Sequence, residues 1–386
     1  MATTITDYAG LVAIGSDLAG DYILGNDIDA SGENFTPLGT FTGTLDGKGY
    51  AITDFTITIN AAGSQKGALF TRNDGTIRDL GFEDCAISVT STNNSARACA
   101  VATDNRGTIT ECWSTGTITA SSGDTWTWAS AAGIANTNNT LGSGTITKSY
   151  STATCTATSP GYASAAGLVG TNYGDISESY ASGNVSAAGG ATRPVYAGGL
   201  VGINGYDFAD YEGIITDSYA RGDATATGGA TNYAGGLVAE QDMASSSITD
   251  SYSTGIPTGA DAAGGLLGLN TAGTITTSFW DEDTSGTAVS DGGTGKSTSE
   301  MKTKTTFTYA GWDFIVIWFI NGVTNDGYAF HWTAPPEPIE SPRETVDIED
   351  KITLECVRNV EMAAGGRSYV DKEGNFCYRS RYARNA

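Results

Sequence analysis

The stretch GLVGTNYGDISESYASG, residues 167–183, decides the fold of this 386-residue chain, because versions of it recur along the sequence. Each version begins with a phrase close to Gly-Leu-Val and continues to Ile-x-x-Ser-Tyr or a variant of it. One copy is too short to bury its own apolar side chains, whereas a stack of copies can do so. The sequence therefore predicts a repeat protein.

The spacing of the copies limits the kind of repeat. Seven copies start at intervals of 33, 33, 34, 32, 37 and 29 residues. Their first residues are Gly67, Ala100, Gly133, Gly167, Gly199, Gly236 and Gly265. A propeller blade needs about 40 residues or more, and a leucine-rich repeat needs a leucine frame that these copies lack. Abundant small residues, with Thr and Ile at short intervals, favour short strands and tight corners. We therefore predict an all-β solenoid, a β-helix.

Two positions in each copy predict ladders of stacked side chains. An Ile recurs, and an aromatic residue follows four positions later. The predicted ladder residues are Ile109, Ile146, Ile176, Ile215, Ile248 and Ile275, with Tyr150, Tyr180, Tyr219, Tyr252 and Phe279. The residue two positions after each Ile is usually polar, as at Glu178, although a flat strand would bury it. A bend there would turn it outward, and the glycines suit corners that need positive φ or close backbone approach.

Three copies, GLVGTNYGDISESYASG, GLVGINGYDFADYEGIITDSYARG and GLLGLNTAGTITTSFW, resemble GLUG-motif repeats. The resemblance covers roughly residues 10–332 and implies a right-handed parallel β-helix. Repeats of this kind occur in bacterial surface adhesins, in extracellular regions of large peptidases and in phage-encoded proteins. The resemblance therefore indicates an architecture and leaves the function open.

Composition changes along the chain predict five segments. They are an N-terminal cap with entry strands at 1–60, β-helix repeats at 61–280, a C-terminal cap at 281–333, a Pro-rich linker at 334–343 and a small β module at 344–386. Residues 4–18 predict a short amphipathic helix with an Asp7 cap, which would cover the open end of the stack. The segment after Trp280 predicts a loop, and SYV and FCYRS near the end predict two strands joined by a turn.

Charge, hydropathy and cysteine usage exclude several classes of function. The net charge of −23 argues against binding to nucleic acid or to an anionic membrane. The longest apolar run, residues 314–320, is too short to insert across a bilayer. The first ten residues lack the regions of a Sec signal, so we expect synthesis in the cytoplasm and a destination on a virion or another extracellular structure. The six cysteines include no CxxC pair and predict free thiols.

Few residues suit catalysis. A Ser–His–Asp triad would require His331, the one histidine of the chain, and its aromatic surroundings predict a packed side chain instead. The acidic cluster Asp281, Glu282 and Asp283 predicts a solvated corner. We therefore expect no catalytic residue, no cofactor and no metal site, with calcium at corners rich in Asp, Asn and Gly as the alternative.

Irregular copies carry the candidate ligand-binding residues. Insertions there place aromatic and acidic side chains together, which suits sugar recognition by stacking and hydrogen bonding. The candidates are Trp126, Trp128, Tyr206, Asp207, Phe208, Asp210 and Tyr211. The alternative is that these aromatic residues pack on neighbouring coils or subunits.

These observations favour a non-enzymatic structural or adhesive protein. It would belong to a virion, as a tail fibre, spike or capsid decoration, or to an extracellular appendage, and would expose a surface for glycans or proteins. Residues 344–386 would attach it to other structural proteins and to further copies of itself as a homo-oligomer. Two alternatives stay open, a carbohydrate-active tailspike depolymerase and a fragment of a bacterial surface adhesin.

Overall fold

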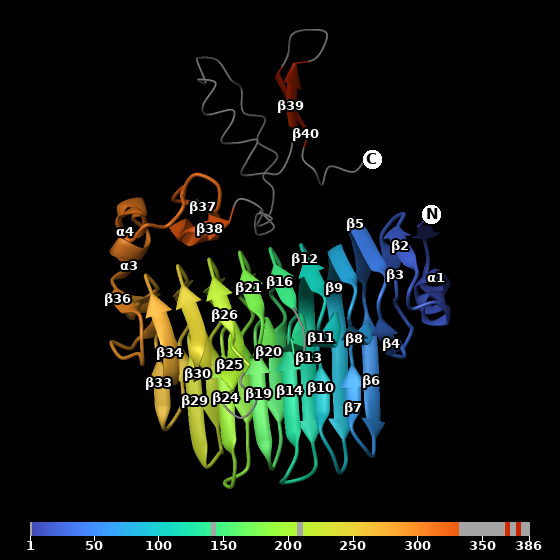
Figure 1. Cartoon of the computed structure of the whole chain (residues 1–386), viewed down its shortest axis with the longest axis horizontal. Coiled ribbons are helices and arrows are strands. Elements are labelled where there is room, and N and C mark those ends of the chain that lie inside the picture. The colour runs from blue at the N-terminus through green and yellow to red at the C-terminus, as the bar shows by residue number, and fades with distance from the viewer. Residues whose placement is uncertain (1, 140–143, 207–210, 332–366, 371–375, 380–386) are drawn as a thin grey trace. The chain divides into compact units, whose positions relative to one another are not determined.

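The computed structural model describes residues 2–139, 144–206 and 211–331, together with the backbone of two strands at 367–370 and 376–379. The chain divides into two compact units, residues 1–298 and 299–386, and each is described by itself. The first unit is a parallel β-helix whose coils stack along one axis (Figure 1), as the sequence predicted. Within the described residues its strands form one sheet of 29 strands and a second sheet of seven.

The coil that contains the stretch 167–183 illustrates the path of the chain. Its strands, in order, are β19 (Tyr162–Ala166), β20 (Val169–Asn172), β21 (Asp175–Ser177), β22 (Tyr180–Ala181) and β23 (Val185–Ala188). Each strand pairs in parallel with its equivalent on the next coil, so that Val169 lies opposite Val201 and Ile176 opposite Ile215. The repeat in sequence is therefore a repeat in space, residue for residue.

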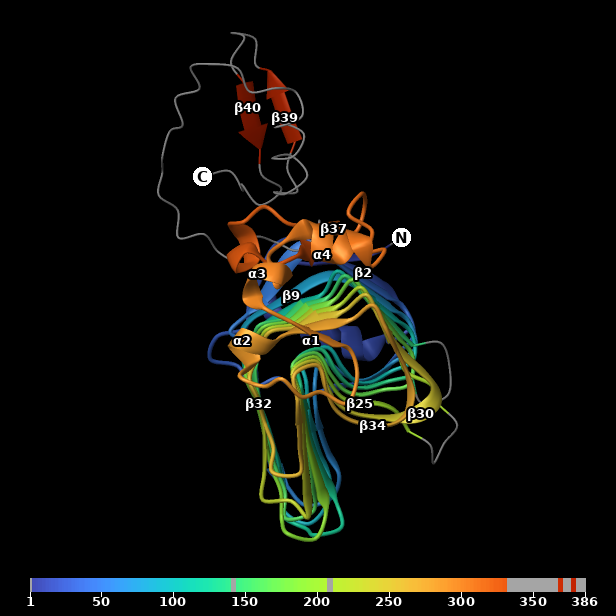
Figure 2. The ribbon, with the colours of Figure 1, turned by 90° about the vertical axis from the view of Figure 1, so that its left-hand side faces the viewer.

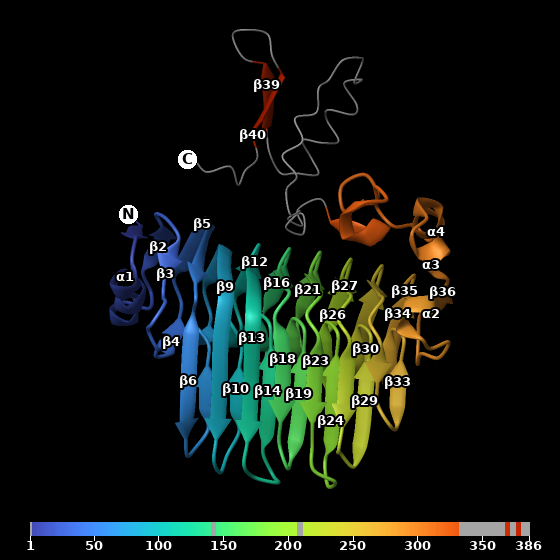
Figure 3. The ribbon, with the colours of Figure 1, turned by 180° about the vertical axis from the view of Figure 1, so that it is seen from behind.

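Equivalent strands form columns along the stack (Figures 1 and 3). The seven-stranded sheet contains β7 (Gln65–Gly67), β10 (Ala96–Ala98), β14 (Trp128–Ala132), β19, β24 (Pro194–Gly198), β29 (Thr231–Gly235) and β33 (Ala262–Gly264). The next column contains β4 (Leu38–Phe41), β8 (Phe70–Asn73), β11 (Ala102–Asn105), β15 (Ala135–Asn138), β20, β25 (Val201–Tyr206) and the first parts of β30 (Val238–Thr249) and β34 (Leu267–Thr276).

The remaining columns continue the large sheet. The Ile column contains β12 (Thr108–Thr110), β16 (Thr145–Thr147), β21, β26 (Ile214–Thr216) and parts of β5 (Thr44–Thr53), β9 (Thr76–Ser91), β30 and β34. The aromatic column contains β17 (Tyr150–Ser151), β22, β27 (Tyr219–Ala220), β31 (Tyr252–Ser253), β35 (Phe279–Asp281), β36 (Thr294–Lys296) and the start of β13 (Trp113–Ser122). The last column contains β6 (Thr56–Ala61), β18 (Thr154–Thr158), β23, β28 (Ala224–Thr227), β32 (Pro257–Thr258) and the ends of β9 and β13.

Each coil extends into a thin arm, which is visible in the view along the stack (Figure 2). One layer of the arm is the seven-stranded sheet and the other is the column that contains β18 and β23. Small buried side chains such as Ala129, Ala131, Ala163 and Ala165 lie between the layers. Because alanine is short, the layers approach closely, which explains the abundance of this residue in the copies.

The corners form where the sequence predicted bends. The polar residues two positions after each Ile all have a left-handed conformation, with Glu178 at φ 47° and Lys148 at φ 49°. The initial glycines serve close approach instead of positive φ. A Cβ built on Gly167 would lie 2.1 Å from the Gly199 carbonyl oxygen of the next coil. Only glycine fits at that distance.

A ladder of buried amides, which the sequence analysis missed, also joins the coils. The Nδ2 atom of each asparagine donates to the side-chain oxygen of its equivalent on the next coil, at 2.8–2.9 Å between Asn73 and Gln241. The rungs are Asn73, Asn105, Asn138, Asn172, Asn204 and Gln241. This ladder satisfies polar groups inside the stack without water.

The N-terminal prediction of a helix over 4–18 is wrong in extent. Residues Thr3–Ile5 form strand β1, which pairs with β2 (Asp21–Leu24), and the helix α1 covers only Tyr8–Ala13 before the 3-10 turn η1 (Ile14–Ser16). Asp7 caps α1 as predicted, because its Oδ1 accepts the Gly10 N–H at 2.8 Å. Residues 3–5 form a strand instead of a helical turn because pairing with β2, as between Ile5 and Leu24, is more stable than one isolated helical turn. Strand β3 (Ile28–Asp29) follows and pairs with β5.

The loop predicted after Trp280 contains three short helices, so that prediction is wrong. They are α2 (Glu282–Ser285), α3 (Thr298–Met301) and α4 (Lys304–Tyr309). The buried Asp281 carboxylate starts α2 by accepting the N–H groups of Asp283 and Thr284. Such a capping interaction makes a helix out of an acidic stretch that reads as a loop.

The second unit contains an aromatic cluster and a separate strand pair. Trp312 packs on Phe307 and Trp318, at ring distances of 4.7 and 4.6 Å. After α4 the second unit also contains β37 (Trp318–Phe319), η3 (Thr324–Gly327) and β38 (Phe330–His331). Strands β39 (Arg367–Val370) and β40 (Phe376–Arg379) pair antiparallel, as the sequence predicted. Among the residues with described positions, no helix is both long and apolar enough to cross a membrane.

Candidate functional site

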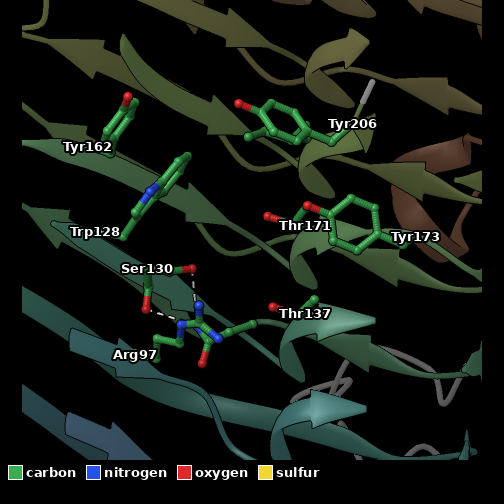
Figure 4. Close-up of a pocket in the computed structure, with 10 residues that line it drawn as sticks. Arg97, Trp128, Ser130, Thr137, Tyr162, Thr171, Tyr173 and Tyr206 are labelled. Atoms are coloured by element: carbon green, nitrogen blue, oxygen red, sulfur yellow. Dashed lines mark hydrogen bonds between the residues drawn. The ribbon is translucent and has the colours of Figure 1, made fainter. Parts of the chain in front are cut away.

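A pocket of about 330 Å³, called the groove below, lies at the elbow where the arm meets the rest of the coil (Figure 4). One wall is the outer face of the seven-stranded sheet and the other is the column that contains β15, β20 and β25. The lining residues are Arg97, Trp128, Ser130, Asn136, Thr137, Tyr162, Thr171, Tyr173, Ile203 and Tyr206. Four successive coils therefore contribute to one pocket.

Strand alternation places the first wall. In β10 and β14 the alanines at every second position are buried in the arm, so Arg97 and Ser130 between them face the groove. Parallel register aligns these side chains in a row along the axis. The row contains Lys66, Arg97, Ser130, Ser164, Tyr196 and Tyr233. The row consequently changes from cationic at its N-terminal end to aromatic at its C-terminal end.

The second wall is a parallel row on the other side of the elbow. It contains Asp104, Thr137, Thr171, Ile203 and Glu240. Asp104 pairs with Arg106 at 2.9 Å, so its charge is compensated within its own strand and corner. In the middle of this wall lie the hydroxyls of Thr137 and Thr171. The ion-paired Asp104 lies at one end of the row and the buried Glu240 at the other.

The bottom of the elbow depends on the fourth residue of each copy. A Cβ on Gly170 would lie 2.7 Å from the Ser130 Oγ, so glycine lets the two walls meet. One coil carries Asn136 at the equivalent place, and its Nδ2 donates to the carbonyl oxygens of Ser130 at 2.9 Å and Ala98 at 3.0 Å. The Asn136 Oδ1 is buried at the pocket without a hydrogen-bond partner in the described structure. Its capacity to accept a hydrogen bond is therefore not used by the described residues.

Aromatic rings form a stack on the arm side of the groove. Trp128 and Tyr162 are parallel within 3°, with centroids 4.4 Å apart, and Tyr196 lies 6.1 Å from Trp128. Both rings that stack on Trp128 belong to later coils. On the preceding coil its neighbour is the small Ser95, whose Oγ accepts the Trp128 N–H and which has no ring to stack. The stack therefore ends at Trp128, beside Arg97.

Electrostatics differ between the two ends. At one end, burial and the neighbouring Arg97 lower the pKa of Lys66. At the other end, burial and the nearby Asp242 raise the pKa of Glu240 to about 7, although a hydrogen bond from Tyr196 favours its charged form. Burial is also the main cause that raises the pKa of Tyr173 to about 12. The walls are thus desolvated enough for hydrogen bonds to be strong.

The structure brings together two of the predicted ligand-binding residues. Trp128 and Tyr206 line the same pocket. Trp126 lies at the tip of the arm, 75% exposed, with the Arg193 guanidinium 4.0 Å above its ring. Tyr211 forms a backbone bridge with Tyr206, and its ring lies 5.6 Å from Tyr173. The other three candidates, Asp207, Phe208 and Asp210, lie outside the described residues.

The other predicted residues lie as follows. The Ile residues from Ile109 to Ile248 are fully buried, and Ile275 is partly buried. Tyr150, Tyr180, Tyr219 and Tyr252 stack at 4.8–5.0 Å, and Phe279 is the register partner of Tyr252. Four cysteines are buried free thiols, namely Cys85, Cys99, Cys112 and Cys155, as predicted for them. His331 is buried against Trp318, at 4.5 Å.

Sequence reasoning missed the other eight lining residues, which are Arg97, Ser130, Tyr162, Asn136, Thr137, Thr171, Tyr173 and Ile203. The signal that could have found the first three is the period-two pattern before each Gly-Leu-Val, as in Ala-Arg-Ala, Trp-Ala-Ser-Ala and Tyr-Ala-Ser-Ala. It separates residues buried in the arm from those that face the groove. In the described part of the chain, no group of three or more His, Cys, Asp and Glu side chains could hold a metal ion.

Comparisons with known proteins agree with this architecture. Residues 194–227 match the family model described as "The GLUG motif", so the chain contains a GLUG motif. A segment of 103 residues is 40% identical to a protein of Evansella cellulosilytica named "Putative Gly-rich membrane protein". That match covers 25% of this chain and 11% of the relative, so the chain corresponds to a small part of it.

Two solved structures share the fold. A crystal structure from Bacteroides ovatus, of "a putative immunoglobulin A1 protease", has a TM-score of 0.51 and 20% identity, over 86% of this chain and 93% of that one. A second, named "IgA1 Protease", has a TM-score of 0.50 and 19% identity, over 71% of this chain and 21% of that one. At this level of identity the similarity supports the β-helix fold alone.

Proposed function

We propose that this chain is a non-enzymatic structural and adhesive protein, displayed on a virion or on another extracellular structure, and that the elbow groove binds a glycan or a protein. The observation that carries the proposal is the pocket that combines the Trp128–Tyr162 stack with hydroxyl groups and Arg97. Apolar ring surface with a few convergent polar groups is the usual composition of a ligand site.

The scaffold supports binding because the groove is held in shape before a ligand arrives. Its walls are sheet faces whose strands pair with both neighbouring coils, and Asn136 ties the two walls together. A preorganised site loses little conformational entropy on binding. Four successive coils line the pocket, which suits a chain-like ligand that spans several coils.

The name of one relative fits a role at a surface. A protein that matches a 103-residue segment of this chain is named a membrane protein. In this proposal residues 344–386 attach the β-helix to its assembly or to other copies of itself. Mass spectrometry of purified virions or extracellular filaments from the source tests the location, and absence of the protein from both contradicts it.

Binding by the groove is tested with a glycan array and a panel of host surface proteins, using the full chain and the variant Trp128→Ala. We expect the variant to lose at least roughly tenfold in affinity for whatever ligand is found, because aromatic anchors dominate binding energy. The matched control is Tyr309→Ala, which removes an exposed aromatic residue that does not line the pocket. Equal binding by the wild type and Trp128→Ala would place the ligand elsewhere.

A second candidate, a polysaccharide depolymerase, rests on Glu240 and Asp242. Both lie on β30, and Glu240 is 7% exposed, receives a hydrogen bond from Tyr196 and has its pKa raised to about 7. A carboxyl group that is protonated near neutral pH suits a general acid beside a second carboxylate. Release of reducing ends from capsular polysaccharide, abolished by Glu240→Gln, would favour this candidate.

A further inference from the structure

We infer that the groove recognises an acidic glycan, a chain with carboxylate-bearing sugar units, whose carboxylate binds at Arg97 while a sugar ring packs on Trp128. This inference rests on the proposed binding function and specifies its ligand. Three features support it: the cation Arg97, the end of the aromatic stack at Trp128 and the unpartnered Oδ1 of Asn136 in the described residues.

Arg97 lines the groove, and a second cation, Lys66, precedes it in the same row. Lys66 and Arg97 are register partners on neighbouring strands, and neither forms an ion pair within the described residues. Like charges at paired positions destabilise a sheet. Asp104 attracts Lys66 electrostatically, but it also pairs with Arg106 at 2.9 Å. An anion bound at Arg97 would relieve the repulsion between the two paired cations.

The position of Trp128 fits a sugar beside that anion site. Its ring stacks on Tyr162 toward the C-terminal end, while its neighbour on the preceding coil is Ser95. Figure 4 shows Arg97 and Ser130 on the side of Trp128 opposite to Tyr162. A pyranose has apolar C–H groups on one face and can pack on an indole, while its substituents hydrogen-bond at the ring edge.

Hydrogen-bonding groups for the sugar lie across the groove. Thr137 and Thr171 present hydroxyls on the opposite wall, and the buried Asn136 Oδ1 has no partner in the described residues. Asn136 is 2% exposed, so a donor that reaches its Oδ1 would satisfy an otherwise orphaned acceptor. Sugar hydroxyls are donors and acceptors and match this mixed set.

An acidic peptide fits less well. Peptides commonly bind to β proteins by adding a strand to a free sheet edge. Both walls of this groove are faces of sheets, and the strands β10, β14 and β19 already have partners on both sides. A peptide would therefore leave much of its backbone without hydrogen bonds, whereas a glycan has no such requirement.

The test uses the full chain with short oligogalacturonates and with the same oligosaccharides as methyl esters, which remove the charge and keep the ring. Binding is measured by calorimetry. We expect the acid to bind at least tenfold more tightly than the ester. Arg97→Gln should weaken the acid by roughly 10- to 100-fold and leave the ester unchanged, because it removes a charged hydrogen bond. Trp128→Ala should weaken both.

Controls separate this inference from the wider proposal. Arg78→Gln removes a surface cation of the Ile column, where Arg78 pairs with Asp46, and does not touch the pocket. This variant should bind as the wild type does. Trp128→Tyr guards against a folding defect and should restore most of the affinity. Equal binding of acid and ester, with no effect of Arg97→Gln, would overturn the acidic ligand while the proposed function stands. Binding of polyglutamate in place of the sugar would overturn the glycan. Binding of no probe or array ligand would contradict the proposed function itself.

Discussion

At the residue scale, the asparagine in the phrase Gly-Leu-Val-Gly-x-Asn explains much of the precision of the stack. Asn172 accepts from Asn138 at 2.9 Å and donates to Asn204 at 2.9 Å, and its side chain is fully buried. Each amide thus satisfies two neighbours and is satisfied by them. A coil shifted by one residue would break every rung, so the ladder selects one register.

Replacing one rung tests this role. Asn172→Ala leaves the buried Oδ1 of Asn204 without a partner and leaves the Nδ2 of Asn138 with only a 3.4 Å bond to the Asp175 carbonyl oxygen, so we expect a loss of about 3 kcal/mol in the free energy of unfolding. Urea denaturation followed by circular dichroism measures it. The control is Asn60→Ala, which changes an exposed asparagine of β6. Equal stability of the two variants would show that the ladder is dispensable.

A second residue-scale prediction concerns pH. The raised pKa of Glu240, about 7, means that the folded state holds its proton more tightly than the unfolded state. The folded state therefore binds more protons between about pH 4.5 and 7, and the stability that Glu240 contributes at low pH is lost as the pH rises through this window. The titratable groups that act on Glu240 are the carboxylate of Asp242 and the hydroxyls of Tyr196 and Tyr206.

Glu240→Gln isolates this effect, because glutamine keeps the acceptor for Tyr196 and cannot ionise. The variant should gain stability relative to the wild type as the pH increases from 4.5 to 7, by up to about 3 kcal/mol. Urea denaturation at several pH values gives the difference directly. A constant difference across this range would mean that Glu240 has an ordinary pKa.

At the element scale, the joint between the arm and the next column limits what each coil can carry. A Cβ on Gly199 would lie 2.0 Å from the Gly236 carbonyl oxygen, which belongs to the backbone and cannot move aside. Gly199→Ala should therefore separate two coils and cost roughly 3 kcal/mol or more, measured by urea unfolding. Gly15→Ala is the control, because its Cβ meets only the Leu38 side chain, at 3.2 Å. If Gly199→Ala leaves the free energy of unfolding unchanged, the coils can move apart enough to accept a Cβ at this position.

The same scale separates what the sequence predicts from what it does not. Regular spacing predicts the strand columns, and polar residues such as Glu178 predict the corner, because burial and bending are local demands of one copy. The arm is not predictable from spacing, since a closed coil and a folded-back arm have the same period. The pocket is harder still, because Arg97, Trp128, Thr171 and Tyr206 come from four coils and meet only after the stack forms.

At the scale of the whole first unit, stability should be close to a sum over coils and their interfaces, because backbone pairing joins each coil only to its neighbours. The register supports a direct test. Ala165 pairs with Ala197, and Ala166 with Gly198, so deletion of residues 166–197 joins Ala165 to Gly198 with every column still in phase. The asparagine ladder would then continue from Asn138 to Asn204.

We expect this deletion to give a folded β protein that unfolds cooperatively, with a melting temperature lower by on the order of 5 °C, because one interface is lost and no register changes. Deletion of residues 166–181 is the matched control. It removes half a coil, joins Ala165 to Ser182 and places a strand of the arm where the Gly-Leu-Val corner belongs. Circular dichroism and thermal melts compare the two. If the full-coil deletion unfolds as readily as the half-coil deletion, the coils depend on contacts beyond their neighbours, and a groove assembled from successive coils would not be free to vary in length.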